Sequence, residues 1–253
     1  MRDHVLSKIP AEIITSSLLA MRIPASLAIL FTQNDLPKKV DANPVLLIPG
    51  LGASDVSMYW LQLNLQRSGY QVYGSGLLRN EGSFEKQGEQ LQERISRISE
   101  ETGKPVDIVG WSMGGRYAVH LSDTNPDQVG KIITLGSPLI NYDLAPAREQ
   151  AWVVALTMVN ISSEDLRREM RSDCRIPDAK HPLSAIIGTY DAVVEARGSV
   201  LPEALLIKNN HIENIYVGTG HIGLGLSRRV LQIAIDRLDQ PVHSWQTYLS
   251  TIQ

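Results

Sequence analysis

Short apolar segments alternate with longer amphipathic stretches along the chain from about residue 40 onward. Several of the short segments are rich in Val, Ile and Leu, which is typical of strands that are covered on both faces. The alternation itself is typical of parallel strands joined by crossover helices. It predicts an α/β fold: a mostly parallel sheet of about six strands with helices on both faces. The expected strands are Val45–Ile48, Gln71–Tyr73, Val106–Val109, Lys131–Leu135, Ser184–Ile187 and Asn214–Val217.

Two of the stretches between the strands carry recognisable helix ends. Ser83 can cap the start of a helix that Gly103 ends, and Ser227 can cap the last helix of the fold. Apolar residues recur at helical spacing in both stretches, so each helix presents one apolar face. These residues are Leu91, Ile95 and Ile98 in the first helix and Val230, Leu231, Ala234, Ile235 and Leu238 in the second.

One region breaks the alternation of strands and helices. Residues 141–182 hold two helical stretches and no strand candidate. Such an insertion can be a cap over a pocket, and it can equally be a longer crossover that only packs against the sheet. Because no repeat or low-complexity linker divides the chain, we expect residues 1–253 to form one domain. Residues 1–40 would be its N-terminal helical segment.

The N-terminal stretch is rich in apolar residues but is interrupted by charges and prolines. Its uncharged runs, Ile13–Met21 and Ile23–Asn34, are both shorter than the roughly 20 apolar residues that cross a bilayer. Glu12 also interrupts the apolar region that a signal peptide needs. We therefore expect amphipathic helices packed on a cytoplasmic domain, with peripheral membrane contact or a lid role for this segment as the alternatives.

Composition removes several classes of function. The 253 residues include 24 Lys or Arg and 27 Asp or Glu, and the net charge of −3 gives no general attraction to nucleic acid. The single cysteine, Cys174, excludes an internal disulfide and a cysteine-rich zinc site. No group of His, Asp and Glu has metal-ligand spacing, and no glycine cluster has the context of a dinucleotide fingerprint. The sequence therefore predicts neither a metal nor another cofactor.

The clearest chemical signal is a Gly-x-Ser-x-Gly motif centred on Ser112. The expected strand Val106–Val109 precedes the motif, and a helical stretch follows it. A tight strand-to-helix turn would thrust the Ser112 hydroxyl away from the sheet and strain its backbone. Crowding around such a turn leaves no room for side chains at Gly110 and Gly114. N–H groups at the start of the following helix would face developing negative charge.

With this motif and its surroundings, residues 43–238 resemble the α/β-hydrolases, and more narrowly the bacterial esterases and lipases of that superfamily. The resemblance implies the α/β-hydrolase fold, with Ser112 as the nucleophile and the N–H of Met113 as half of the oxyanion hole. The other half would be the N–H of Leu51, in the Pro-Gly-Leu-Gly turn after the first strand. A proline there replaces the histidine that is common in the family.

The resemblance also implies a base and an acid later in the chain. The family places its histidine on a glycine-bordered loop after the last strand, where His221 stands. It places its acid after an earlier strand end, where Asp191 completes a Gly-x-x-Asp pattern. The resulting chain order of Ser, Asp and His is that of the family. His211 is the alternative for the base, and Asp143 is the alternative for the acid.

Together these residues imply a serine hydrolase that cleaves small-molecule or lipid carboxylic esters through an acyl-enzyme, without a cofactor. Three alternatives stay open: an acyltransferase with the same triad, a ligand-binding protein on a hydrolase scaffold, and a peripheral membrane-bound lipase.

Two further sequence features near the motif each allow two interpretations. Gly136-Ser137-Pro138 either lies near the pocket, as a similar segment does in lipase-like relatives, or simply ends a strand. Trp111 either lines the pocket or packs beneath Ser112.

Overall fold

The computed structural model describes residues 39–139 and 180–248 of the chain. Within these residues, six strands form one sheet in the order β2-β1-β3-β4-β5-β6, and every neighbouring pair is parallel. The predicted α/β fold is thereby confirmed. The strands are β1 (Val45–Ile48), β2 (Val72–Gly74), β3 (Val106–Trp111), β4 (Val129–Leu135), β5 (Leu183–Gly188) and β6 (Ile212–Val217).

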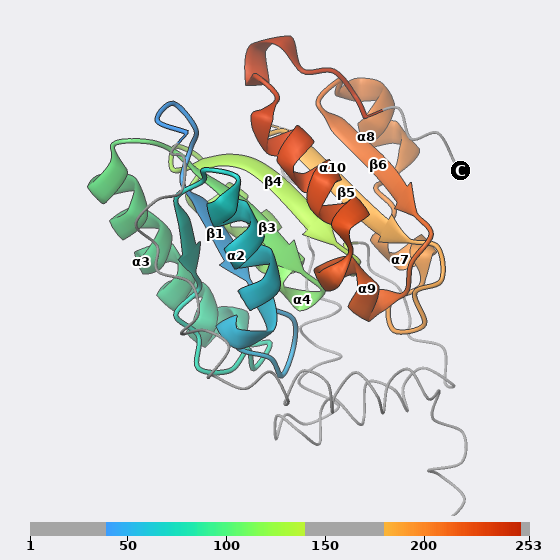
Figure 1. The fold of residues 1–253 in the computed structure, drawn as a ribbon, viewed down its shortest axis with the longest axis horizontal. Coiled ribbons are helices and arrows are strands. Elements are labelled where there is room, and N and C mark those ends of the chain that lie inside the picture. Colours follow the sequence, from blue (N-terminus) through green and yellow to red (C-terminus); the bar gives the residue numbers. More distant parts are fainter. Residues whose placement is uncertain (1–38, 140–179, 249–253) are drawn as a thin grey trace, which may run out of the picture.

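Helices cover both faces of the sheet because successive strand side chains point to opposite sides. In β1, Leu46 and Ile48 belong to one buried apolar cluster, and Val45 and Leu47 belong to the other. Figure 1 shows α2 and α10 in front of the sheet, over the second cluster. The face with Leu46 and Ile48 is covered by α3 (Phe84–Thr102), α4 (Met113–Thr124), α7 (Ala196–Ser199) and α8 (Glu203–Lys208). The face with Val45 and Leu47 is covered by α2 (Tyr59–Arg67), α9 (His221–Leu226) and α10 (Arg228–Asp239). The 3-10 turns η4 (Asp55–Met58) and η5 (Val242–Ser244) complete the described elements.

The two capped helices begin where the sequence predicts. The Ser83 side chain accepts a hydrogen bond from the Lys86 N–H at 3.3 Å, at the start of α3. The Ser227 side chain accepts one from the Arg229 N–H at 3.2 Å, at the start of α10. Gly103 ends α3 in the left-handed conformation, with φ of 65°. Side-chain capping and the glycine stop therefore fix these helix ends, as their sequence pattern indicates.

The main difference from the sequence prediction follows the last strand. His221, expected on a loop, is the first residue of α9. Glycine disfavours helices, so a stretch with Gly223 and Gly225 inside it predicts a loop. Here tertiary packing overrides that preference, because the helix lies against Trp111. A Cβ on Gly225 would lie 2.9 Å from a ring carbon of Trp111, so the absence of a side chain permits this close contact.

Several predictions concern residues outside the described ranges. The predicted N-terminal helical segment and the predicted helical insertion lie almost entirely outside these ranges. Cys174 and Asp143, the alternative acid, also lie outside them. Within the described ranges, no helix combines the length and the apolar character needed to cross a membrane.

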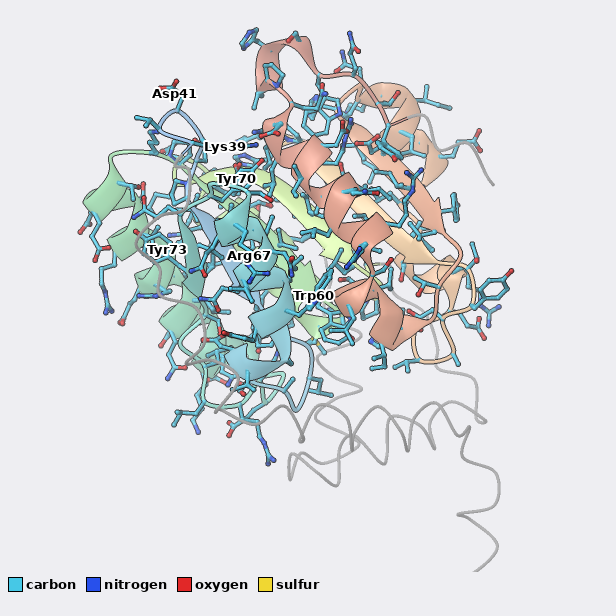
Figure 2. All side chains as sticks on the ribbon, in the orientation of Figure 1. Lys39, Asp41, Trp60, Arg67, Tyr70 and Tyr73 are labelled. Carbon is cyan, nitrogen blue, oxygen red and sulfur yellow. The ribbon has the colours of Figure 1, made fainter. Side chains whose placement is uncertain are left out.

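A polar cluster ties the start of the described chain to the end of α10. Lys39 Nζ donates to the two carboxylate oxygens of Asp239 at 2.6 and 2.7 Å, and the Tyr70 hydroxyl donates to the same carboxylate at 2.5 Å. Burial, reinforced by Asp239, raises the pKa of Tyr70, so its hydroxyl stays a donor. Figure 2 shows Lys39 and Tyr70 in the upper half of the molecule, whereas the strands end below.

Candidate active site

Four of the strands lead directly to residues singled out in the sequence. β1 leads to Leu51, β3 to Ser112, β5 to Asp191 and β6 to His221. Because the strands are parallel, their carboxyl ends share one edge of the sheet, which is where open α/β sheets bind ligands. This edge is the lower one in Figure 1, where α4 and α9 begin. The topology therefore gathers these distant parts of the sequence at one edge.

Ser112 lies on a strained turn between β3 and α4. Its φ of 54° and ψ of −121° make it the one non-glycine residue with a positive φ in the described parts of the chain. A Cβ on Gly110 would lie 2.4 Å from the carbonyl oxygen of Gly114, and a Cβ on Gly114 would lie 2.1 Å from that of Ile48. Both distances are far below a van der Waals contact, so the turn can form only with glycine at these two positions.

The turn after β1 runs beside Ser112 and leaves one N–H group unused. A Cβ on Gly50 would lie 3.2 Å from the Cβ of Ser112, which places the two backbones in close contact. The Leu51 N–H donates to no other residue in the described ranges. The N–H of Met113 stands at the first position of α4, where a helix offers no internal acceptor. Two unused backbone donors therefore lie beside Ser112.

His221 and Asp191 form a buried, directly bonded pair. Their Nδ1 and Oδ2 atoms are 2.7 Å apart, and 7% of each residue is exposed. The other oxygen of Asp191 accepts from the N–H groups of Val193 and Val194 at 2.9 and 2.8 Å. The carboxylate is thus held by its own turn while it faces the imidazole ring. A buried carboxylate with all its partners in place fixes the orientation of that ring.

Trp111 and Gly136 support this pair from two sides. The Trp111 indole N–H donates to the His221 carbonyl oxygen at 3.2 Å, so the residue before Ser112 also anchors the start of α9. Trp111 is buried, and its ring packs against Gly225 of α9. Gly136 follows β4 with φ of 54°, and a Cβ there would lie 2.8 Å from Asp191 Oδ2 and 3.2 Å from His221 Nδ1. Gly136 therefore lies directly against the His221–Asp191 pair.

The structure brings some candidates together and separates others. Within the part of the chain that is described, no hydrogen bond joins Ser112 to His221 directly. The two are linked through Trp111, which precedes Ser112 and donates to the His221 carbonyl oxygen. His211 precedes β6, at the opposite edge of the sheet from Ser112. Over residues 39–139 and 180–248, no three His, Cys, Asp or Glu side chains are arranged to hold a metal ion.

Asn80 belongs to this region, although nothing in the sequence around it indicates a functional role. It is fully buried in the loop between β2 and α3, and its side chain donates to the Pro49 carbonyl oxygen at 2.7 Å. No local pattern marks it, because its partners lie about thirty residues earlier in the chain. The sequence shows only a single Asn between the charged residues Arg79 and Glu81. Such an Asn is ordinarily a turn residue, so it does not indicate a functional role.

Two known triacylglycerol lipases, from Pseudarthrobacter phenanthrenivorans and Burkholderia plantarii, are each 31% identical to this chain over 104 residues. The matched residues make up 38% of this chain and 33% and 29% of the two lipases. The chain thus spans about a third of the length of these relatives. These matches confirm the resemblance to bacterial esterases and lipases.

Solved structures show the same fold at low identity. A lipase-esterase related protein from Clostridium acetobutylicum superposes with a TM-score of 0.57 at 14% identity, over 80% of this chain and 97% of that one. The carboxylesterase CesB from Bacillus subtilis superposes with a TM-score of 0.53 at 17% identity, over 81% of this chain and 87% of its own. A family model described as the alpha/beta hydrolase fold matches residues 43–181, more than half of the chain. The chain therefore belongs to the alpha/beta hydrolase fold family.

Proposed function

We propose that this protein is a serine hydrolase that cleaves carboxylic esters, with Ser112 as nucleophile, His221 as general base and Asp191 as its acid partner. The observation that carries the proposal is the 2.7 Å contact between His221 Nδ1 and Asp191 Oδ2, at the sheet edge where Ser112 stands on a strained turn. A carboxylate that accepts from Nδ1 leaves Nε2 of the neutral ring without a proton, so Nε2 can receive one from a serine hydroxyl.

In the acylation step, His221 Nε2 takes the hydroxyl proton of Ser112 as Oγ attacks the acyl carbonyl carbon. The carbonyl oxygen becomes an oxyanion, which the N–H groups of Leu51 and Met113 bind. Asp191 stabilises the imidazolium that forms on His221. His221 then returns the proton to the departing alcohol, and Ser112 remains acylated. The direct bond from Ser112 to His221 is expected to form with substrate bound, since catalytic hydrogen bonds often tighten in the complex.

Water completes the cycle at the same residues. His221 deprotonates a water molecule, which attacks the acyl carbonyl, and the carboxylic acid leaves as Ser112 regains its proton. Similarity to two triacylglycerol lipases supports an ester substrate, of a lipid or a small molecule. Each proton transfer is assigned to a side chain of the protein, so the proposed cycle runs without a cofactor.

The variant Ser112→Ala tests this proposal through hydrolysis of a panel of p-nitrophenyl esters. We expect kcat/KM to fall by at least about 10⁴-fold, because the nucleophile is lost, while the thermal midpoint is retained. Ser122→Ala is the matched control, since Ser122 is a buried serine on α4, the helix that Ser112 precedes, and its hydroxyl donates to the Val119 carbonyl oxygen at 2.7 Å. It should hydrolyse esters at the wild-type rate. Full turnover by Ser112→Ala would refute the assignment.

A further inference from the structure

The turn that carries Leu51 has little intrinsic reason to hold one shape. It contains Gly50 and Gly52, and Gly52 adopts a φ of 75°. Glycine loses more conformational freedom on folding than any other residue, so such a turn must be fixed by its surroundings. Donors in an oxyanion hole contribute most when they are held in place before the charge develops. Whatever fixes this turn therefore bears on the proposed chemistry.

Asn80 holds the turn on both sides of Leu51. Its side-chain Nδ2 donates to the Pro49 carbonyl oxygen at 2.7 Å. Its backbone carbonyl oxygen accepts from the Gly52 N–H at 2.7 Å, and its N–H donates to the Ala53 carbonyl oxygen at 2.7 Å. The bonds to residues before and after Leu51 leave the backbone between them little room to rotate, and Asn80 itself is fully buried.

Asn80 is itself held by a buried glutamine of α3. Gln87 Nε2 donates to the carbonyl oxygen of Arg79 at 2.7 Å, and Gln87 Oε1 accepts from the N–H of Glu81 at 2.8 Å. The two residues that flank Asn80 are thus clamped by one side chain. The Tyr117 hydroxyl donates to the same Oε1 at 3.2 Å. Because Tyr117 lies on α4, this network connects the helix that begins with Met113 to the turn that contains Leu51.

We infer that Asn80 is a positioning residue of the active site: it holds the Leu51 N–H where the oxyanion forms. This inference rests on the proposed function and adds a residue to it. Without the Nδ2 donor, the Pro49 carbonyl is left buried and unpaired, and the peptide between Pro49 and Leu51 rotates to find another partner. The Leu51 N–H then leaves its position, and stabilisation of the transition state falls while binding of the substrate changes little.

The variant Asn80→Asp removes the donor and keeps the size of the side chain and its Oδ1 acceptor. We expect kcat per labelled active site to fall by about 10- to 100-fold with KM nearly unchanged. This is less than the roughly 10²- to 10³-fold loss when an oxyanion donor is removed, because here the donor is displaced and not deleted. The affinity for a boronic acid, which mimics the tetrahedral intermediate, should fall by a similar factor. Asn80→Ala, which introduces no buried charge, should show the same pattern if Asn80→Asp folds poorly.

Asn214 offers a matched control far along the sheet. On β6, Asn214 Oδ1 accepts from the Leu201 N–H at 2.9 Å and its Nδ2 donates to the Leu201 carbonyl oxygen at 3.0 Å. Asn214→Asp therefore breaks the same kind of bond away from the candidate site. It should lower the thermal midpoint while kcat per active site stays within about twofold of wild type.

Active-site titration with a fluorophosphonate separates the possible outcomes. If wild type is not labelled, the proposed function fails and this inference fails with it. If wild type is labelled and the folded Asn80 variants keep their kcat and boronate affinity, the inference alone is overturned. A lower labelled fraction with unchanged kcat per labelled site would also overturn it, because that result describes a purely structural role.

Discussion

Gly136 shows how closely the backbone of a neighbouring strand supports the His221–Asp191 pair. We expect Gly136→Ala to reduce kcat/KM by about 100-fold, because its methyl group would lie 2.8 Å from Asp191 Oδ2 and force the pair apart. Gly103→Ala is the control, since Gly103 also has a positive φ, of 65°, but a methyl group there would meet nothing within 4 Å. Steady-state kinetics should show wild-type activity for this control despite similar backbone strain. Equal activity of the two variants would contradict the account.

Individual site residues differ in how far the sequence can reveal them. Ser112, Asp191 and His221 are recognisable because each follows a strand and carries a local pattern of glycines. Asn80 and Gln87 are not, because their role depends on hydrogen bonds to backbone groups of distant loops. The sequence marks Gly136 as part of a strand-ending segment, but its contact with Asp191 depends on where the chain after β5 places that carboxylate. The residues that the sequence does not reveal are those whose role depends on contacts with distant parts of the chain, which no local pattern encodes.

At the scale of elements, the contact between α3 and α4 makes stability depend on pH. His120 of α4 packs edge-on against the Phe84 ring with centroids 5.3 Å apart, and burial lowers its pKa, an effect that Asp123 offsets in part. The unfolded chain therefore binds a proton at His120 before the folded chain does. This part of the stability is complete above about pH 6.5 and is lost as pH falls below it.

The variant His120→Gln tests that dependence through thermal unfolding at several pH values between about 5 and 8. It should lose less stability than wild type over the acid half of this range, because the group that titrates is gone. His181, whose pKa burial also lowers, should preserve part of the dependence. An unchanged slope of stability against pH in the variant would contradict the role of His120.

Strands were predicted better than short helices. No strand bound differs from its prediction by more than two residues. The strands β1, β3 and β5 are buried at every position and are rich in Val, Ile and Leu, which marks them in the sequence. The ends of α3 and α10 follow from serine caps that act locally. In contrast, α9 is held by packing on Trp111, and its glycines indicate a loop when the sequence is considered alone. Sequence patterns therefore predict helices that local capping defines, and they miss a short helix that packing against a distant residue stabilises.

At the scale of the whole molecule, the candidate triad and the polar cluster of Lys39, Tyr70 and Asp239 are separate, so variants of the two should have separable effects. The candidate triad lies at the carboxyl edge, whereas the Lys39, Tyr70 and Asp239 cluster lies away from it. We expect Tyr70→Phe to lower the free energy of unfolding by about 1 kcal/mol, because a part-buried hydrogen bond to a carboxylate is lost. Its kcat/KM should equal that of wild type.

Tyr73→Phe is the control for that prediction, since the Tyr73 hydroxyl bonds only an exposed Gln71 side chain among the interactions described. Urea denaturation should place it within about 0.5 kcal/mol of wild type. Tyr70 is only 4% exposed whereas Tyr73 is half-buried, so the comparison tests what burial of the hydroxyl contributes. If Tyr70→Phe were as stable as Tyr73→Phe, the hydrogen bond from Tyr70 to Asp239 would not contribute to stability, which would contradict this prediction.

Labelling by a fluorophosphonate is the most direct test of the central claim that Ser112 is an activated nucleophile. The account predicts one covalent adduct on the intact wild-type protein, mapped by peptide sequencing to Ser112, and no adduct on Ser112→Ala. Such a result requires a base and an oxyanion site assembled around that hydroxyl. A folded wild-type protein that forms no adduct, or forms it at another residue, would contradict the assignment of Ser112, Asp191 and His221.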